Sequence, residues 1–448
     1  MIPEQNIFFH SVRLDEEKCK GCTNCIKHCP TGAIRVRRGK AYIIKERCID
    51  CGECIRICPS HAKYAEKYPF DEIFRYKYKI ALPAPTLYGQ FNNLNDPDIV
   101  LTALKEMGFD DVCEVSQAAE IVSEATRLIM QDDRIPRPVI SSACPAVVRL
   151  IRVRFPNLID HVLDLNAPME EAARIAREKA LRETDYKNDD IGVFFISPCT
   201  AKITAIKSPI CNIKSYVNGV FGIKDIYPAL LSKMEKQSQT EALKKSGIIG
   251  VSWASSGGES AALLNDRYLA ADGIENVIHV LEEIEDEKLN DLDFIELNAC
   301  PGGCVGGPLT VENPYVAKAR IHRLRKYMPV SCNHLPSSEV PKSLYWQKPL
   351  EPVSVMKLAD NVREAMVKMK ELNDIFEMLP GLDCGTCGAP SCRDLAEDIV
   401  RGKASINDCV FFTSENISEG NYIPIPAPFR RNEEKDKAEK TEEKKNDG

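Results

Sequence analysis

Cysteines are the residues of this sequence whose type and spacing carry chemistry. The chain has 448 residues and 19 cysteines. Clustered cysteines in a cytosolic protein bind metal or perform redox chemistry more often than they form disulfides. Eight of them form two quartets with the spacing C-x2-C-x2-C-x3-C, and all four positions recur at the same offset (48 − 19 = 29), which indicates an internal duplication. The quartets are Cys19, Cys22, Cys25 and Cys29, followed by Pro30, and Cys48, Cys51, Cys54 and Cys58, followed by Pro59.

The duplicated spacing resembles the bacterial two-cluster ferredoxin, in which the fourth cysteine of each quartet binds the other cluster. The resemblance covers about residues 10 to 70 and implies two [4Fe–4S] cubes. A pair of zinc sites is the alternative, but zinc motifs do not usually place three thiolates in one x2, x2 run. The implied ligand sets are Cys19, Cys22, Cys25 and Cys58 for one cube, and Cys48, Cys51, Cys54 and Cys29 for the other.

A third group of cysteines lies near the end of the chain, at Cys384, Cys387, Cys392 and Cys409. Glycines 385 and 388 let backbone N–H groups approach the sulfurs, and a short helix is predicted after Cys392. The segment resembles the small four-cysteine [4Fe–4S] domain of Rnf-type electron-transport and corrinoid iron–sulfur proteins, which implies a third cube. A zinc ribbon is the alternative.

Between residues 79 and 330, short apolar runs alternate with helical patterns, which predicts an α/β core. Three of these runs end at a cysteine: PVISSAC at Cys144, IGVFFISPC at Cys199 and DFIELNAC at Cys300, with Cys304 four residues later. Ligand sites in open α/β sheets lie beyond the carboxyl ends of the strands. A lone buried cysteine is usually only a small apolar residue, but four in this pattern predict one buried metal site.

These cysteine motifs resemble the catalytic domain of the [FeFe]-hydrogenases. The similar segments are SSACP, SPCTAK and ELNACPGGCVGGP, together with ALKEMGFDDV, SEAT and WASSGGESAALL. The resemblance implies that Cys144, Cys199, Cys300 and Cys304 bind the cubane half of an H-cluster. Cys304 would bridge to a two-iron half with carbonyl, cyanide and dithiolate ligands. Lys202 matches the lysine that hydrogen-bonds an iron-bound cyanide, and a buried ammonium needs such an anionic partner.

The sequence departs from the family pattern in the residues that deliver protons. Efficient members have a proton-carrying cysteine just before the first ligand, where this chain has Ala143. Glu124 matches the first glutamate of the family's relay, but Arg127 and Ala167 stand at the next two positions. The two methionines that flank the site in the family are Ser197 and Asn298 here, and the third motif continues as GGPLTVENP.

A retained cluster scaffold with an incomplete proton path is similar to a divergent branch of the family thought to sense hydrogen or redox state. The leading hypothesis is therefore an iron–sulfur electron-transfer protein that senses hydrogen or redox state, or relays electrons, with at most slow H₂ turnover. One alternative is a working hydrogenase, 2 H⁺ + 2 e⁻ ⇌ H₂, with an altered proton path. The other is a non-enzymatic module that holds only [4Fe–4S] cubes.

Charge and hydropathy narrow the range of partners. The net charge of −7 and a pI of about 5.7 argue against nucleic-acid binding. The sequence has no apolar run long enough for a membrane span and no secretory signal, so we expect a cytoplasmic protein. The expected partners are a ferredoxin, oxidoreductase or signalling protein and, if a two-iron centre is present, the maturation machinery that builds it.

The predicted fold is a multidomain α/β protein. It combines a small α+β ferredoxin-like domain, a two-lobed α/β hydrogenase-like domain, a small mostly helical [4Fe–4S] module with a preceding amphipathic helix, and a disordered charged tail. Cys113, Cys211 and Cys332 fit no motif and receive no ligand role. The predicted boundaries are 1–78 for the ferredoxin-type domain, 79–330 for the hydrogenase-like domain, 331–350 for a linker, 351–420 for the C-terminal module and 421–448 for the tail.

Overall fold

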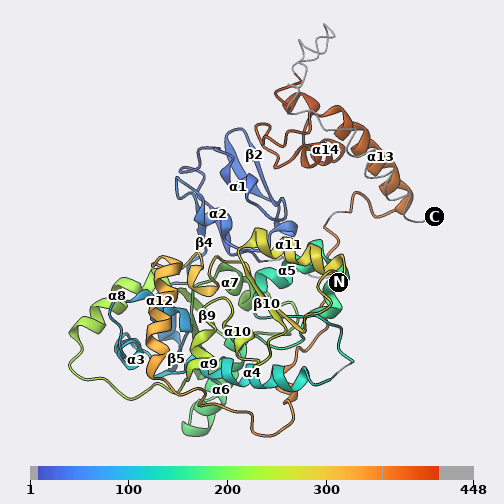
Figure 1. The fold of residues 1–448 in the computed structure, drawn as a ribbon. Helices are drawn as coiled ribbons and strands as arrows, with labels where there is room; N and C mark the ends of the chain where they lie inside the picture. The colour runs from blue at the N-terminus through green and yellow to red at the C-terminus, as the bar shows by residue number, and fades with distance from the viewer. Residues whose placement is uncertain (1–8, 133, 356, 413–448) are drawn as a thin grey trace. The chain divides into compact units, whose positions relative to one another are not determined.

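The computed structural model describes residues 9–132, 134–355 and 357–412, so the predicted tail over 421–448 lies outside the described residues. The chain divides into two compact units, and Figure 1 labels the elements of both. The larger unit comprises Met1–Lys18 and Lys45–Val353. The smaller unit comprises Cys19–Ile44 and Ser354–Gly448, so the ferredoxin-like segment is divided between the two.

A four-stranded parallel sheet with the order β6-β5-β8-β9 organises the larger unit. All seven residues of β8 are buried, and their continuous apolar run is typical of a parallel strand covered on both faces. The strands are β5 (Tyr78–Pro83), β6 (Asp111–Val112), β8 (Ile191–Ser197) and β9 (Gly219–Gly222).

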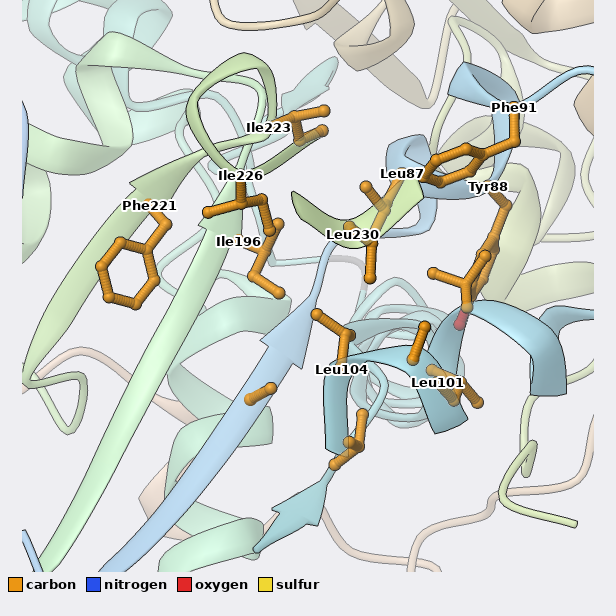
Figure 2. Close-up of a cluster of buried hydrophobic side chains, with 14 of the residues drawn as sticks. Leu87, Tyr88, Phe91, Leu101, Leu104, Ile196, Phe221, Ile223, Ile226 and Leu230 are labelled. Carbon is orange, nitrogen blue, oxygen red and sulfur yellow. The ribbon is translucent and has the colours of Figure 1, made fainter. Parts of the chain in front are cut away.

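Helices cover both faces of this sheet, because successive side chains of β8 point in opposite directions. Phe194 packs into one core and Phe195 into the other. Figure 2 shows the first of these cores, in which Phe221 of β9 lies beside Ile196 of β8 and Ile226 of α8. The first face carries α3 (Pro97–Glu106), α8 (Ile223–Lys236) and α12 (Pro314–Leu324); the second carries α4 (Val115–Ile129), α6 (Pro168–Glu183) and α7 (Thr200–Lys207).

A second parallel sheet, with the order β10-β11-β7, forms the other lobe of the larger unit. Its strands are β7 (Val139–Ile140), β10 (Tyr268–Asp272) and β11 (Phe294–Asn298). One face packs against α5 (Pro145–Arg154) and α11 (Ile274–Glu285). Three short helices complete the unit: α2 (Glu53–Arg56), α9 (Ile248–Ser252) and α10 (Gly258–Ala261). The two parallel sheets confirm the predicted two-lobed α/β class.

The ferredoxin-like segment forms two antiparallel strand pairs. In the larger unit β1 (Val12–Leu14) pairs with β4 (Lys63–Ala65). In the smaller unit β2 (Ile34–Arg37) pairs with β3 (Lys40–Ile43) and follows α1 (Asn24–Lys27). Helices α1 and α2 begin 29 residues apart (53 − 24 = 29), so the duplication seen in the cysteines extends to the backbone.

The smaller unit also contains α13 (Val362–Met378) and α14 (Cys392–Val400), in agreement with the predicted helical module. Helix α13 begins after Asn361, whose side chain accepts a hydrogen bond from the Arg363 backbone N–H at 2.8 Å. Of its apolar stripe Leu372 is buried, but Met366 is 69% exposed within this unit. No helix in the described part of the chain is long and apolar enough to cross a bilayer.

Residues 331–350, predicted to be a linker, lie against the larger unit. The Asn166 N–H donates to the Leu344 carbonyl at 2.8 Å, and the Trp346 N–H donates to the Asp164 carbonyl at 2.9 Å. The Leu344 side chain is buried in the core below them. This segment is therefore packed onto the larger unit along part of its length.

A buried ion pair joins the two chain segments of the smaller unit. Arg35 of β2 is fully buried, and its Nε donates to Asp398 Oδ2 of α14 at 2.8 Å. Its Nη2 donates to Asp394 Oδ1 at 3.0 Å. Asp398 is only 3% exposed, so neither charge of the main pair can be solvated if its partner is removed.

We expect Arg35→Met to loosen the smaller unit, because the buried Asp398 would lose its closest cation and keep only Arg37, which donates to the same carboxylate oxygen at 2.9 Å. Losing one hydrogen bond to a charged group costs about 1.5–3 kcal/mol. Backbone amides of β2 and α14 should then exchange with deuterium about 10-fold faster or more, measured by mass spectrometry of the full chain. Arg38→Met, at an exposed position in the adjacent turn, is the control. Equal exchange rates in the two variants would contradict a structural role for the pair.

Candidate metal centre

The four central cysteines follow the carboxyl ends of parallel strands, as the apolar runs predict. Cys144 follows β7 and caps α5, and Cys199 follows β8 and caps α7. Cys300 comes two residues after β11, and Cys304 opens a short 3-10 turn. Since helix N-termini favour negative charge, Cys144 and Cys199 occupy positions suited to thiolates.

The loop that carries Cys304 is held by glycines in close contact with neighbouring backbone. Gly303 has φ +88°, and a Cβ there would lie 2.4 Å from the Ser256 nitrogen. A Cβ on Gly307 would lie 2.2 Å from the carbonyl oxygen of Pro198, the residue before Cys199. The glycine-rich sequence thus lets the third motif pack directly onto the second.

The four thiols lie within electrostatic range of one another. Burial, followed by the charge of Cys144, raises the pKa of Cys199 to about 12. Burial, followed by Cys199, also raises the pKa of Cys300 well above its usual value. Burial raises the pKa of Cys304, while the nearby Lys202 ammonium opposes that shift. Burial and neighbouring sulfurs thus disfavour ionisation of Cys199, Cys300 and Cys304, and a cationic iron–sulfur core would stabilise these sulfurs as coordinated thiolates.

A cavity lies beside Cys304. Lys202 lines it, with its Nζ 5.7 Å from the centroid of the Phe195 ring. Thr86 Oγ1 is a further buried polar atom of this lining, and nothing among the described residues hydrogen-bonds to it. A hydroxyl and an ammonium on the wall of this cavity suit a ligand with anionic or polar atoms. The remaining lining includes Ala143, Pro198, Trp253, Glu259, Glu296 and Asn298.

The two ferredoxin-type quartets share one backbone design. Positive φ angles recur at the same offset, at Gly21 and Asp50 and again at Thr23 and Gly52. The Ala33 N–H donates to Cys29 Sγ at 3.2 Å, and the equivalent Ala62 N–H donates to Cys58 Sγ at 3.3 Å. Such N–H···S bonds are typical of cluster ligands. The crossed pairing of Cys29 and Cys58 stays a prediction, because the quartets belong to different units.

The second quartet directly adjoins the central cysteines within the larger unit. Thr200, the residue after Cys199, donates from Oγ1 to the Asp50 carbonyl at 2.6 Å. Arg56 donates from Nη2 to the Gly306 carbonyl at 2.8 Å. Burial alone would lower the pKa of Arg56, but the negative charges of Cys300, Glu53 and Cys51 outweigh burial, so the pKa is raised overall.

The C-terminal cysteines also come together within the smaller unit. Burial raises the pKa of Cys409, and the charges of the other three cysteines raise it further. Cys392 begins α14, and its N–H donates to Asp383 Oδ1 at 2.6 Å. This mutual influence is the pattern expected of four ligands to one centre. The other ligand candidates are Cys384 and Cys387.

Comparison with known families assigns three segments of the chain. Residues 77–308 match the C-terminal domain of the iron-only hydrogenase large subunit, which is just over half of the chain. The chain belongs to the iron-only hydrogenase large subunit family. Residues 11–59 match a 4Fe-4S dicluster domain, and residues 379–411 match a putative Fe-S cluster domain. The predicted hydrogenase-like, ferredoxin-type and C-terminal iron–sulfur segments are confirmed at this level.

Individual hydrogenases are distant from this chain. It is 26% identical over 369 residues to the periplasmic [Fe] hydrogenase large subunit of Nitratidesulfovibrio vulgaris, covering 66% of this chain and 86% of that protein. It is 24% identical over 256 residues to iron hydrogenase 1 of Clostridium pasteurianum, covering 46% and 44%. A solved structure of apo [FeFe]-hydrogenase HydA1 from Chlamydomonas reinhardtii is similar at 16% identity and a TM-score of 0.47, covering 63% of this chain and 93% of that one.

The relay positions suggested by the hydrogenase resemblance lie apart from the cavity beside Cys304. Glu124 accepts a hydrogen bond from the Leu335 N–H at 2.9 Å and lies 3.4 Å from His334. Arg127 donates to the Ala262 carbonyl. Ala167 lines a different cavity, near Cys211. Neither Glu124, the predicted relay residue, nor Arg127 and Ala167, which replace the next two relay positions, is among the residues that line the cavity beside Cys304.

Two buried glutamates in the cavity wall were missed by sequence reasoning. Ser141 Oγ lies 2.8 and 2.7 Å from the two carboxyl oxygens of Glu259. Glu296 accepts hydrogen bonds from the Gly257 and Ser260 N–H groups at 3.0 and 2.9 Å. A glutamate inside the apolar run FIELN was the available signal, because a charge on a buried strand needs a specific partner.

The glutamate pair is expected to carry a proton at neutral pH. Burial, followed by the charge of Glu296, raises the pKa of Glu259 to about 8. Burial also raises the pKa of Glu296, opposed by its hydrogen bonds. Because the folded pKa exceeds the unfolded value, the stability from this proton falls as pH rises from about 4.5 towards 8.

We therefore expect difference infrared spectra to show a neutral carboxylic acid at pH 7 that loses its proton between about pH 7 and 9. Glu259→Gln should remove this band because the amide cannot titrate. Glu283→Gln, at an exposed position of α11, should leave the band in place. A band that persists in Glu259→Gln would contradict the assignment.

Proposed function

We propose that this chain is an iron–sulfur electron-transfer protein whose central site takes an H-cluster-type group and serves hydrogen or redox sensing, or electron relay, with at most slow H₂ turnover. The observation that carries the proposal is the wall of the cavity beside Cys304. It keeps Lys202 for an anionic ligand but has the methyl group of Ala143 where a proton donor is needed.

The residues present fit the two parts of such a group. Cys144, Cys199, Cys300 and Cys304 would hold a cubane, and the cavity beside Cys304 would receive the two-iron part. Lys202 would orient that part by donating to an anionic ligand. When bound, the two-iron group supplies the redox centre at which protons and electrons interconvert with hydrogen.

Electrons would reach this site through the second quartet. The Thr200–Asp50 hydrogen bond and the Arg56–Gly306 hydrogen bond directly link the segment of the second quartet to the segments that carry the central cysteines. The positive charge of Arg56 lies near both Cys51 and Cys300 and favours the reduced, more negative state of either cluster.

The second candidate function is a working hydrogenase with an altered proton path. The observation that favours it is the Glu259–Glu296 pair, which lines the same cavity and in which Glu259 accepts a hydrogen bond from Ser141. A carboxyl group with a pKa near neutrality is suited to proton transfer. In this mechanism Glu259 would hold the proton that Ala143 cannot carry.

Iron analysis and infrared spectroscopy test the cofactor assignment on the full chain co-expressed with hydrogenase maturation proteins. We expect about sixteen irons for four cubes, and two more when the two-iron part is bound. Carbonyl and cyanide infrared bands should accompany those two irons. Sixteen irons without the bands would instead support a module that holds only cubes, and hydrogen assays at the rate of efficient hydrogenases would overturn the sensing proposal.

Ala143→Cys is expected to raise hydrogen turnover by about 100-fold or more, the contribution typical of a positioned proton donor. Hydrogen uptake and evolution would be measured on protein with matched iron content. Ser142→Cys is the matched control, because the Ser142 hydroxyl donates to the Leu165 carbonyl and this residue lies outside the cavity lining. An unchanged rate in Ala143→Cys would show that proton delivery at this position does not limit the reaction.

The proposed partner is a redox protein: a ferredoxin, an oxidoreductase or a signalling protein that reads the state of the clusters. A gel-filtration or crosslinking screen with proteins encoded nearby would identify it. A signalling protein that binds only one redox state would support sensing, whereas a catalytic hydrogenase subunit would support the second candidate.

A further inference from the structure

The C-terminal cysteine module is packed against the first quartet's segment within the smaller unit. The Val36 N–H of β2 donates to the Gly388 carbonyl at 2.8 Å. Gly388 has φ +82°, and a Cβ there would lie 1.8 Å from the Val36 oxygen. Only glycine allows this approach, so the residue after Cys387 is shaped for contact with β2.

The segments that carry the cysteines also lie close together. A Cβ built on Gly385 would lie 3.4 Å from Ile26 Cδ1 and 3.4 Å from Lys27 Cε, so the Gly385 backbone is near both side chains. Gly385 follows Cys384, and Ile26 follows Cys25. One ligand candidate of each group is therefore a single residue away from this close approach.

A cation from the first segment faces the C-terminal cysteines. Arg37 of β2 donates from Nη1 to the Cys387 carbonyl at 2.6 Å and from Nη2 to Asp398 at 2.9 Å. Its Nε is buried, and no hydrogen-bond partner for it is present in the described part of the chain. Burial raises the pKa of Cys387, and the Arg37 charge opposes that shift. The guanidinium thus places positive charge within electrostatic range of this thiol.

We propose that the C-terminal cluster exchanges electrons with the cluster of the first quartet across this contact, and that Arg37 is a positioning residue that raises the reduction potential of the C-terminal cluster. The inference rests on the proposed function in assuming that both sites hold [4Fe–4S] cubes. In each step one reduced cube is oxidised by one electron and the other is reduced by it. No bond changes and no proton moves.

The charge argument sets the direction of the effect. A nearby cation and hydrogen bonds to sulfur favour the reduced form of a cluster, because reduction adds negative charge. The alternative is a module tethered to the chain that docks only onto an external partner. That arrangement would leave the potential of the C-terminal cluster independent of a residue on β2.

Redox titration followed by electron paramagnetic resonance tests the role of Arg37 on the full, cluster-loaded chain. In Arg37→Gln we expect the oxidised form of the C-terminal cube to be favoured about tenfold, a fall of about 59 mV for a one-electron couple. Arg37→Lys should recover part of the shift. Arg38→Gln, on the exposed neighbouring residue, should leave the potential unchanged. No shift in Arg37→Gln would overturn the assignment of Arg37.

A pair of glycine variants tests the contact itself. Gly388 and Gly402 both have left-handed φ, but a Cβ on Gly402 meets nothing within 4 Å. We expect Gly388→Ala to abolish the magnetic interaction between the two reduced cubes and Gly402→Ala to retain it. Persistence of the interaction in Gly388→Ala would overturn the proposed route.

Iron content separates this inference from the proposed function. If the wild-type chain holds only two cubes outside the central site, the C-terminal cluster is absent. The electron route and the four-cube part of the proposed function would then fail together. A full set of clusters with no magnetic interaction in the wild type would overturn the route alone. If Gly388→Ala loses iron, the reduction potential of the C-terminal cluster in Arg37→Gln tests the proposal instead: a fall supports it and an unchanged potential overturns it.

Discussion

The cost of ionising closely spaced cysteine thiols is the constraint on which the larger unit depends. Burial first, and then the charge of neighbouring sulfurs, disfavours the thiolate, as the high pKa of Cys199 reflects. The thiolate form is stable only with positive charge among the sulfurs, which an iron–sulfur core supplies. Because the thiolates repel one another, the rest of the fold must hold the four cysteines close together.

The order of the strands in the two parallel sheets brings these cysteines together. Cys144 and Cys300 follow adjacent strands of one parallel sheet, and Cys199 follows the central strand of the other. The strands are fixed by apolar cores on both faces, so the positions of the sulfurs are set by packing. The same arrangement lets residues next to the ligands, such as Ala143 before Cys144 and Lys202 in the first turn of α7, line the adjoining cavity and set its chemistry.

Spacing and apolar runs predicted the cysteine groups and the two-lobed α/β class, because metal ligands and parallel strands leave local patterns. The Glu259–Glu296 pair left only a faint pattern, since its significance depends on a short helix, α10, and a strand, β11, meeting at the wall of one cavity. Arg35 and Asp398 are a stronger example. They lie 363 residues apart, and no local periodicity relates an arginine on one strand to an aspartate on a distant helix. Long-range polar pairs are specified by the fold and become visible only with it.

That separation has a consequence for synthesis. Translation proceeds at about 5–20 residues per second, so Asp398 follows Arg35 from the ribosome by roughly 20 to 70 s. During this interval the first quartet's segment has no ionic partner for the guanidinium that is buried in the finished protein. The ion pair between β2 and α14 can therefore form only after Asp398 has been synthesised, and all residues of the larger unit, which ends at Val353, precede it.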